Sequence, residues 1–411
     1  MSRATTRYAV SPWLHRSSRS RRPDYPRHRG PLEIDVAIVG GGLTGCATAY
    51  AFAAAGIHVA LFEAARVGQG ATAYGGGLIT SDPGVDFLAL EAQYGRRAAR
   101  HVWQAWRHAA LDAMATLRRL AIPCHLQPRD AIRLAARDED KTLRREWQAR
   151  RDAGLEASLL KGAALARETG SDGLGLRTRD HGQMDPYRAC VGLARAAAAR
   201  GASLFERSAV RRITFDRRRA SLQTEGGTVT AGRVVIATGL PTPLFRPLQR
   251  HFAAIDTYLV LTEPVPAAVR KTAVRPGLIL RDGATPPHHL HWEDEDRRLL
   301  ISGADQPAVP ASQQSRVLVQ RTGQLMYELS TLYPAVSGLQ AEYGWRVTYG
   351  RAADGLPCVG PHRNYPHHLF ALGQAGQSLA GSFLAGRLLL REYLGDPHRA
   401  DELFAFSRLP R

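Results

Sequence analysis

Residues 35–50, which read DVAIVGGGLTGCATAY, join an apolar run to three glycines and then to a series of small residues. Branched apolar side chains before the glycines are typical of a buried parallel strand. The small residues after them favour a helix up to Ala55, and Gly56 stands where that helix would stop. A second apolar run, residues 57–62, ends in Glu63. The order is therefore strand, glycine turn, helix, strand and acidic residue, within about thirty residues.

Each part of this unit has a physical reason in dinucleotide binding. The first glycine allows a tight turn, the second lets the backbone approach a pyrophosphate, and the third lets helix and strand pack closely. The N-terminus of the helix presents free N–H groups to the phosphates, and the acidic residue would accept hydrogen bonds from a ribose diol. We favour this interpretation over a merely structural turn. The predicted cofactor contacts of the unit are Gly40, Gly42, Leu43, Thr44, Gly45 and Glu63.

The composition is that of an ordinary globular protein. With 411 residues, 44% of them hydrophobic, the chain is long enough for two packed domains. Its four cysteines lie far apart without a CxxC pair, which argues against a metal site or a disulfide framework and favours the reducing cytoplasm. No stretch reaches eighteen consecutive apolar residues, so we expect no membrane span.

The charge of the chain is strongly positive, with a formal net value of +18. Apart from Lys141, Lys161 and Lys271, all of the basic residues are arginines spread along the chain. A coding bias toward arginine explains this at least as well as a binding face does. Because no basic run with interleaved aromatic residues appears, nucleic acid is not the expected partner. Residues 1–30 form a basic arm, which we expect to be loosely ordered.

A second glycine-rich segment, AARVGQGATAYGGGLIT, follows at residues 64–80. This pattern resembles the FAD-dependent D-amino acid oxidase superfamily, in the branch with glycine, sarcosine and gamma-glutamylputrescine oxidases. The resemblance continues through residues 180–213, through GRVVIATG at 232–239, and through ADGLPCVGP and LFALGQAGQSLAGSFLAGRLLL near the C-terminus. It implies further cofactor contacts from Gly70, Ala71, Thr72, Val210, Thr238, Gly239, Gly373, Gly376, Gln377 and Ser378.

The same resemblance implies the attachment of the cofactor and the fold. Part of the family links its flavin to a cysteine shortly before the DGLP-like segment; none stands there, and Cys358 follows it, so we expect non-covalent FAD. We expect an α/β fold in which a Rossmann-like FAD-binding domain is interleaved with an α+β, mixed-sheet substrate domain. The predicted ranges are 1–30 for the arm, 31–115, 176–250 and 343–395 for the FAD-binding domain, 116–175 and 251–342 for the substrate domain, and 396–411 for a C-terminal tail.

The substrate side departs from the family pattern. The family often has an arginine where Tyr74 stands, and a carboxylate-binding arginine where HHLHWEDEDRRLLISGAD (residues 288–305) places His291. Three interpretations of His291 stay open, namely a metal ligand, a residue of a solvated edge strand, and a wall of the substrate pocket. The predicted catalytic residues are Tyr74, His291 and Tyr349.

These expectations define an FAD-dependent amine oxidase or dehydrogenase. The substrate would be a primary or secondary amine, such as an amino acid or a polyamine-like compound. A hydride would pass to flavin N5, the imine would hydrolyse, and O2 or another acceptor would reoxidise the flavin. The alternatives are an FAD-binding subunit of a multi-chain dehydrogenase and a flavoprotein acting on RNA.

Overall fold

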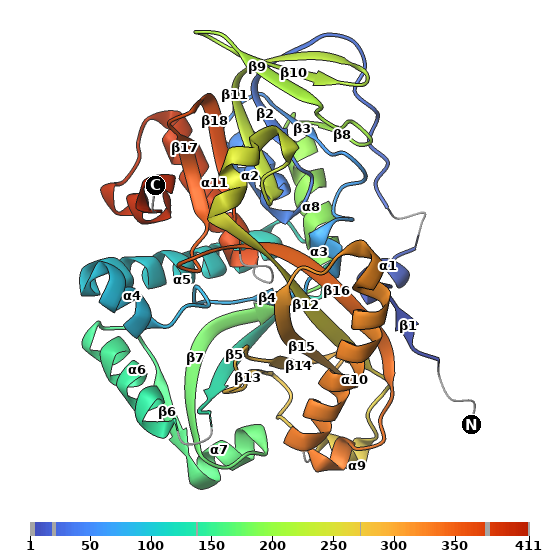
Figure 1. The fold of residues 1–411 in the computed structure, drawn as a ribbon, viewed down its shortest axis with the longest axis vertical. Helices are drawn as coiled ribbons and strands as arrows, with labels where there is room; N and C mark the ends of the chain where they lie inside the picture. Colours follow the sequence, from blue (N-terminus) through green and yellow to red (C-terminus); the bar gives the residue numbers. More distant parts are fainter. Residues whose placement is uncertain (1–4, 19–21, 137–138, 272, 375–378, 410–411) are drawn as a thin grey trace.

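Two β-sheets form the framework of the protein. The structure is a computed structural model, and it describes residues 5–18, 22–136, 139–271, 273–374 and 379–409. In Figure 1 one sheet occupies the upper part of the molecule and the other the lower part, and the chain crosses between them several times. The predicted α/β fold with two mixed units is confirmed.

The upper sheet is built around the parallel strands predicted at residues 35–62. In pairing order its described strands are β17 (Cys358–His362), β18 (Tyr365–Leu372), β11 (Gly227–Gly239), β2 (Leu32–Val39), β3 (Val59–Phe62) and β8 (Ser203–Phe205), and β10 (Ala220–Thr224) and β9 (Arg212–Phe215) continue from β11. Strand β2 pairs in parallel with β11 on one edge and with β3 on the other, so both of its edges are hydrogen-bonded. Its residues Val36, Ala37 and Ile38 are fully buried, as expected of a central parallel strand.

Four helices pack together over one face of this sheet. They are α2 (Leu43–Ala54), α5 (Arg96–Arg119), α8 (Pro186–Ala198) and α11 (Leu379–Leu394). Ile38 and Leu61 belong to the core beneath these helices, whereas Ala37 and Phe62 point to the opposite face. Helix α8 begins as predicted, because the Asp185 carboxylate accepts the backbone N–H of Arg188 at 2.9 Å.

The lower sheet is mixed and mainly antiparallel. In pairing order its described strands are β1 (Arg7–Tyr8), β16 (Ala341–Ala352), β12 (Phe252–Thr262), β15 (Arg298–Pro307), β14 (His289–Glu293), β13 (Leu278–Arg281), β5 (Gln127–Leu134), β7 (Leu174–Gln183) and β4 (Leu78–Ile79), with β6 (Ser158–Lys161) beside β7. Helix α10 (Gln314–Leu332) packs against this sheet, and its Leu325 and Leu329 share a buried core with Tyr258 and Trp292.

Short helices complete the described part of the chain. They are α1 (Pro12–His15), α3 (Ala71–Tyr74), α4 (Phe87–Tyr94), α6 (Asp140–Asp152), α7 (Gly162–Thr169) and α9 (Ala267–Arg270), and the 3-10 helices η2 (Pro243–His251), η3 (Ala311–Gln313), η4 (Pro334–Val336), η5 (Arg399–Phe404) and η6 (Phe406–Arg408).

The pairing of the strands differs from the predicted segment ranges at the crossings. Strands β7 and β16 fall mostly within ranges that we predicted for the FAD-binding domain, yet both pair in the lower sheet. Each of them precedes a return of the chain to the upper sheet. The sequences of these strands, LGLRTRDHGQ and AEYGWRVTYGRA, do not show with which sheet each strand pairs.

The N-terminal arm is more ordered than the sequence suggested. Strand β1 pairs with β16, and Trp13 of α1 is only 7% exposed. The indole N–H of Trp13 donates to the carbonyl of Gly75 at 3.0 Å, and the Ser11 hydroxyl donates to the carbonyl of Ala73. These contacts anchor the arm beside α3, which corrects the expectation of a loose segment.

None of the helices in the described ranges combines the length and the apolar character that crossing a bilayer would require.

Helix α2 and the glycine turn approach each other closely at Gly45, and substitution there should destabilise the protein. A Cβ at this position would lie 1.8 Å from the Gly40 carbonyl oxygen. We expect Gly45→Ala to cost about 3 kcal/mol or more, because the helix and the turn must move apart. The matched control is Gly323→Ala on exposed helix α10, where no atom lies within 4 Å, and it should stabilise by up to about 1 kcal/mol. Urea unfolding measures both, and equal midpoints for Gly45→Ala and the wild type would contradict the packing argument.

Candidate active site

A cleft of about 400 Å³ opens at the carboxyl ends of β2 and β11. In an open parallel sheet this edge is where ligands usually bind, since loops and helix N-termini converge there. The sequence-predicted residues that line the cleft are Gly40, Gly42, Leu43, Thr44, Glu63, Gly70, Ala71, Thr72, Val210, Thr238 and Gly239. Segments that are far apart in the sequence therefore meet at one site.

The two glycine-rich segments contact each other at the start of α2. The backbone N–H of Leu43 donates to the Thr72 hydroxyl at 2.9 Å, so the second segment caps the helix of the first. A Cβ at Gly42 would lie 3.2 Å from that hydroxyl, which leaves little room for a side chain. The two backbones thus form a narrow wall suited to an extended phosphate group.

Glu63 stands at the end of β3 and shapes the glycine turn. Its Oε2 accepts the N–H of Gly41 at 2.7 Å, and its Oε1 accepts the N–H of Ala65 at 2.8 Å. Each carboxylate oxygen has a further lone pair, so Glu63 can hold the turn and still accept the hydroxyls of a ribose.

The opposite wall of the cleft contains a polar side chain that lacks a partner. Both polar atoms of the Gln374 amide are buried, and neither has a hydrogen-bond partner among the described residues. A buried amide in this state costs free energy unless a ligand satisfies it, which fits a polar cofactor in the cleft. Gly373 itself does not line the cleft, but its N–H donates to the carbonyl of Gly239 at 2.9 Å and so holds this wall in place.

Three predicted contacts, Gly376, Gln377 and Ser378, lie outside the described residues.

The positions of the cysteines support a dissociable cofactor. All four thiols are free and buried, and none of them lines the described part of the cleft. Cys358 lies in β17, where burial raises the pKa of its thiol to about 11, so it is a poor nucleophile.

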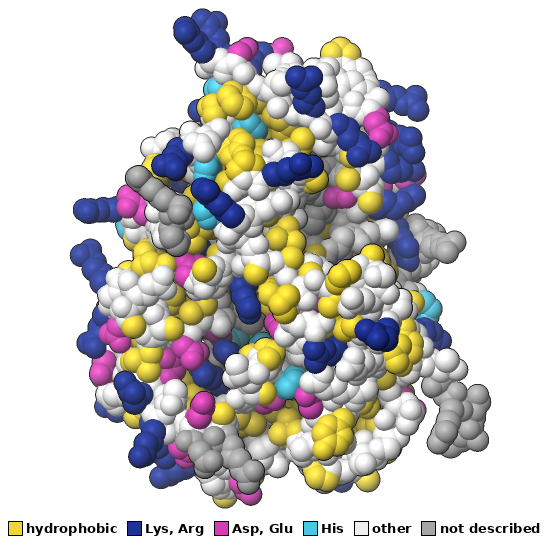
Figure 2. Space-filling view, viewed as in Figure 1, with side chains coloured by type: hydrophobic (Ala, Val, Ile, Leu, Met, Phe, Trp, Pro, Cys, Tyr) yellow, Lys and Arg dark blue, Asp and Glu magenta, His cyan; other side chains and the backbone are white. Residues whose placement is uncertain are grey.

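A second cavity, of about 490 Å³, adjoins the cleft over the lower sheet. Figure 2 shows a hollow near the middle of this face in which basic, acidic and histidine side chains gather. Tyr349 of β16 lines both the cleft and the cavity, which makes it the residue that connects them. Its hydroxyl donates to Asp305 Oδ2 at 2.6 Å, while Thr257 donates to the other carboxylate oxygen at 2.7 Å.

Tyr349 is held in its phenol form. Burial, and then the neighbouring Asp305 carboxylate, raises the pKa of Tyr349 above its ordinary value. Near neutral pH the group therefore donates a hydrogen bond and does not act as a base.

His291 does not lie on the wall of the cavity. Its side chain is fully buried, with Nε2 at 3.1 Å from Glu293 Oε1, and it is not among the residues that line the cavity. Strand β14 runs between β13 and β15, so the solvated edge strand is also wrong. His289 lies on the same face of β14 and does line the cavity, because it pairs with Arg281 where β13 ends.

Tyr74 lies away from both the cleft and the cavity. It lines a separate hollow with Arg346 and Leu318, and its backbone carbonyl accepts the indole N–H of Trp345 at 2.9 Å. Its predicted catalytic role is therefore not supported by its position.

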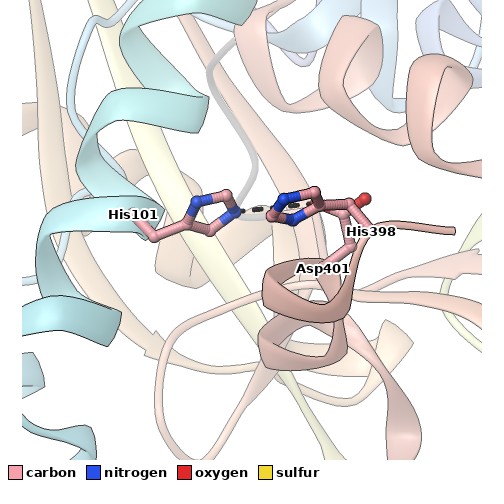
Figure 3. A group of neighbouring side chains, drawn as sticks. All are labelled: His101, His398 and Asp401. Carbon is pink, nitrogen blue, oxygen red and sulfur yellow. Dashed lines mark ion pairs between the residues drawn. The ribbon is translucent and has the colours of Figure 1, made fainter.

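One group of side chains could offer three ligand atoms to a metal ion, and it lies apart from these cavities. His101 of α5 faces His398 and Asp401 of the C-terminal segment, with the ligand atoms within 4.8 Å of one another (Figure 3). Asp401 already pairs with Arg391 at 3.0 Å, and His398 Nδ1 accepts the N–H of Ala400 at 3.2 Å. Asp401 and His398 thus already have interactions within the protein. The cluster connects the C-terminal segment to α5.

The sequence reasoning missed most of the cavity. Three further residues of the cleft are sequence neighbours of predicted residues and could have been included with them. They are Thr348, Gly350 and Gln374. The charged residues of the cavity carry no local motif, except that Arg281-Asp282-Gly283 ends an apolar run with a turn signal. Those that line it are Asp82, Arg133, Arg150, His181, Arg281, His289, Asp305, Arg351 and Asp354.

The fold and the site together define an FAD-binding oxidoreductase, with a glycine-lined cofactor cleft beside a polar cavity. Residues 35–391 match the family described as FAD dependent oxidoreductase (DAO). The chain belongs to this family, and FAD is its cofactor.

Several known proteins resemble the chain over nearly its whole length. Gamma-glutamylputrescine oxidoreductase of Escherichia coli K12 is 26% identical over 389 residues, which cover 92% of this chain and 87% of that protein. A glycine oxidase of Geobacillus kaustophilus is 28% identical over 388 residues, covering 91% of this chain and 96% of that protein.

Solved structures show the same fold. The crystal structure of glycine oxidase from Geobacillus kaustophilus superposes with a TM-score of 0.75 at 22% identity, covering 92% of this chain and 100% of that one. L-Amino acid deaminase from Proteus myxofaciens, in complex with anthranilate, gives 0.76 at 16% identity, covering 96% and 97%.

Glu63→Gln tests the ribose-binding role of the acidic residue. The amide oxygen of Gln can still accept the N–H of Gly41, but its NH2 group cannot accept from a ribose hydroxyl or from the N–H of Ala65. We expect FAD to bind more weakly by about 1.5 to 3 kcal/mol, measured by fluorescence titration of the apoprotein. Glu225→Gln, at an exposed residue paired with Arg211, is the control and should bind FAD normally. Unchanged affinity in Glu63→Gln would remove the residue from the binding site.

Proposed function

We propose that the protein oxidises a primary or secondary amine in the polar cavity, using FAD bound in the cleft. The observation that carries this proposal is the shared position of Tyr349, because an occupant of the cavity near Tyr349 must lie next to an occupant of the cleft. Substrate and cofactor would thus meet at the boundary between the two sheets, where pockets commonly form.

The relatives support the class of substrate. Their names refer to glycine oxidation, L-amino acid deamination and gamma-glutamylputrescine, all of which involve an amine. The electron acceptor is a finer point, for which we propose O2 or another small oxidant.

The residues of this chain would mainly bind and orient the reactants. The glycine turn, Glu63 and Gln374 hold the cofactor, which when bound supplies the acceptor for the hydride that leaves the amine's α-carbon. Asp305 and Tyr349 form a fixed hydrogen-bonded pair at the junction, with the phenol proton donated to the carboxylate. No side chain needs to remove a proton if the amine binds in its neutral form, and water hydrolyses the imine product.

The cofactor should leave the protein on acid precipitation. None of the four cysteines lines the described cleft, so no thiol is placed to form a bond to FAD. We expect the yellow colour and the FAD fluorescence in the supernatant after trichloroacetic acid treatment. Flavin that stays with the protein pellet would contradict non-covalent binding.

Anaerobic mixing with a panel of amines tests the reaction itself. We expect at least one amine to bleach the flavin absorption band, whereas the matched alcohol, which has the same carbon chain without the nitrogen, leaves it unchanged. Dithionite serves as the positive control for a reducible flavin. A flavin that dithionite bleaches but no amine does would instead favour an FAD-binding subunit that needs a partner chain.

A further inference from the structure

The polar cavity is lined by a half-buried cation, Arg281, for which the described residues provide no direct ion-pair partner. Arg281, the last residue of β13, lines this cavity, and its Nε is shielded from water without a hydrogen-bond partner. Within the described ranges, its guanidinium makes no ion pair or hydrogen bond with any side chain or backbone group. An unpaired cation away from water costs free energy unless an anion meets it.

Two neighbouring arginines, unlike Arg281, are paired with acidic residues. Arg133 is paired with Asp86, and Arg150 pairs with Glu146 at 2.6 Å while it stacks at 4.0 Å from the ring centroid of Trp103. These pairs hold both side chains in place as parts of the cavity wall. Arg351 also lines the cavity, but it is exposed and water can solvate it.

Asp82 and Asp86 attract the charge of Arg281 from a distance, but within the described ranges no carboxylate contacts its guanidinium directly. Asp305 is already bonded by Tyr349 and Thr257, and Asp82 accepts the N–H of Gly84 at 2.9 Å without pairing with an arginine. His289, opposite Arg281 in the sheet, is neutral at physiological pH, because burial and then the charge of Arg281 lower its pKa to about 4.

We propose that Arg281 binds a carboxylate group of the substrate. A guanidinium presents two parallel N–H donors that match the two oxygens of a carboxylate, and no carboxylate of the described cavity lining occupies those donors. This inference rests on the proposed amine oxidation and names the class of amine. The family's carboxylate-binding arginine aligns with His291 on β14, whereas the cation that lines the cavity here is Arg281 on β13.

The position of Arg281 also sets the length of the substrate. Strands β13 and β16 are separated by β14, β15 and β12, so Arg281 and Tyr349 lie on well-separated strands of the sheet. Four strand spacings amount to about 19 Å along a flat sheet, which curvature and long side chains shorten. A substrate that reaches both ends must carry its carboxylate several bonds from the carbon that is oxidised. The class is therefore an ω-amino acid or another elongated amine carboxylate, and not an α-amino acid such as glycine.

Calorimetric titration of the FAD-loaded protein with pentanoate tests the anion site without turnover. We expect wild-type protein to bind pentanoate and Arg281→Met to bind it at least about tenfold more weakly, with Arg281→Lys between them. Arg211→Met, which removes an exposed arginine far from the cavity, is the matched control and should bind like the wild type. Equal affinity in wild type and Arg281→Met, or no binding to the wild type, would overturn the proposal.

Thermal unfolding separates a binding role from a structural one. Without ligand, Arg281→Met should unfold at the same temperature as the wild type or above it, because the guanidinium makes no direct ion pair or hydrogen bond with the described residues that the variant would lose. A lower unfolding temperature would show that Arg281 supports the fold, and it would overturn the proposal.

Anaerobic flavin bleaching then tests the length of the substrate. We expect 5-aminopentanoate to reduce wild-type flavin at lower concentration than pentylamine or glycine does, and Arg281→Met to lose this preference for 5-aminopentanoate over pentylamine. Faster reduction by glycine, with the same dependence on Arg281, would overturn the elongated class. Should no amine reduce the flavin while pentanoate binding still depends on Arg281, the amine oxidation fails and the anion site stands.

Discussion

The contact between the glycine turn and the first turn of α2 is the constraint on which the cofactor site depends. Gly40 and Gly45 approach so closely that a single methyl group at position 45 would overlap the carbonyl oxygen of Gly40. That approach directs the N-terminus of α2 at the cleft, where Thr72 and Glu63 complete the wall by bonding Leu43 and Gly41. Strand pairing on both sides of β2 keeps the turn rigid, and the site is therefore formed before any ligand binds.

The lower sheet contributes to the active site through polar side chains, whereas the upper sheet contributes through a backbone turn. Several charged side chains that line the polar cavity have a polar or ionic partner, as Arg150 has in Glu146 and Asp305 has in Tyr349. These pairs fix the shape of the cavity, while the guanidinium of Arg281, which has no direct partner among the described residues, would give it a preference for an anion. Binding energy from a remote carboxylate can position the amine beside the cofactor, which is a common use of non-reacting parts of a substrate.

The sequence predicted the cofactor side well and the substrate side poorly, and the reason is the range of the interactions. The turn, helix and acidic residue at 40–63 are neighbours in sequence, and each obeys a local rule of geometry. Arg281 is brought to the cavity by the parallel pairing of β13 with β5, which are about 150 residues apart in sequence. A contact between segments so far apart produces no pattern in the local sequence. At His291 the sequence left the position of the side chain open, and the structure shows that His289, two residues earlier on the same face of β14, borders the cavity instead.

The central claim is that the cofactor cleft and the polar cavity form one active site joined at Tyr349. Substitution of Tyr349 by Trp, which would fill this junction, tests it most directly when flavin content and anaerobic reduction are measured on the same sample. The account predicts a variant that keeps a full complement of FAD, reducible by dithionite, but that amine substrate reduces at least about a hundredfold more slowly than wild type. Reduction by the amine at the wild-type rate would contradict the account, because the substrate would then reach the flavin by another path.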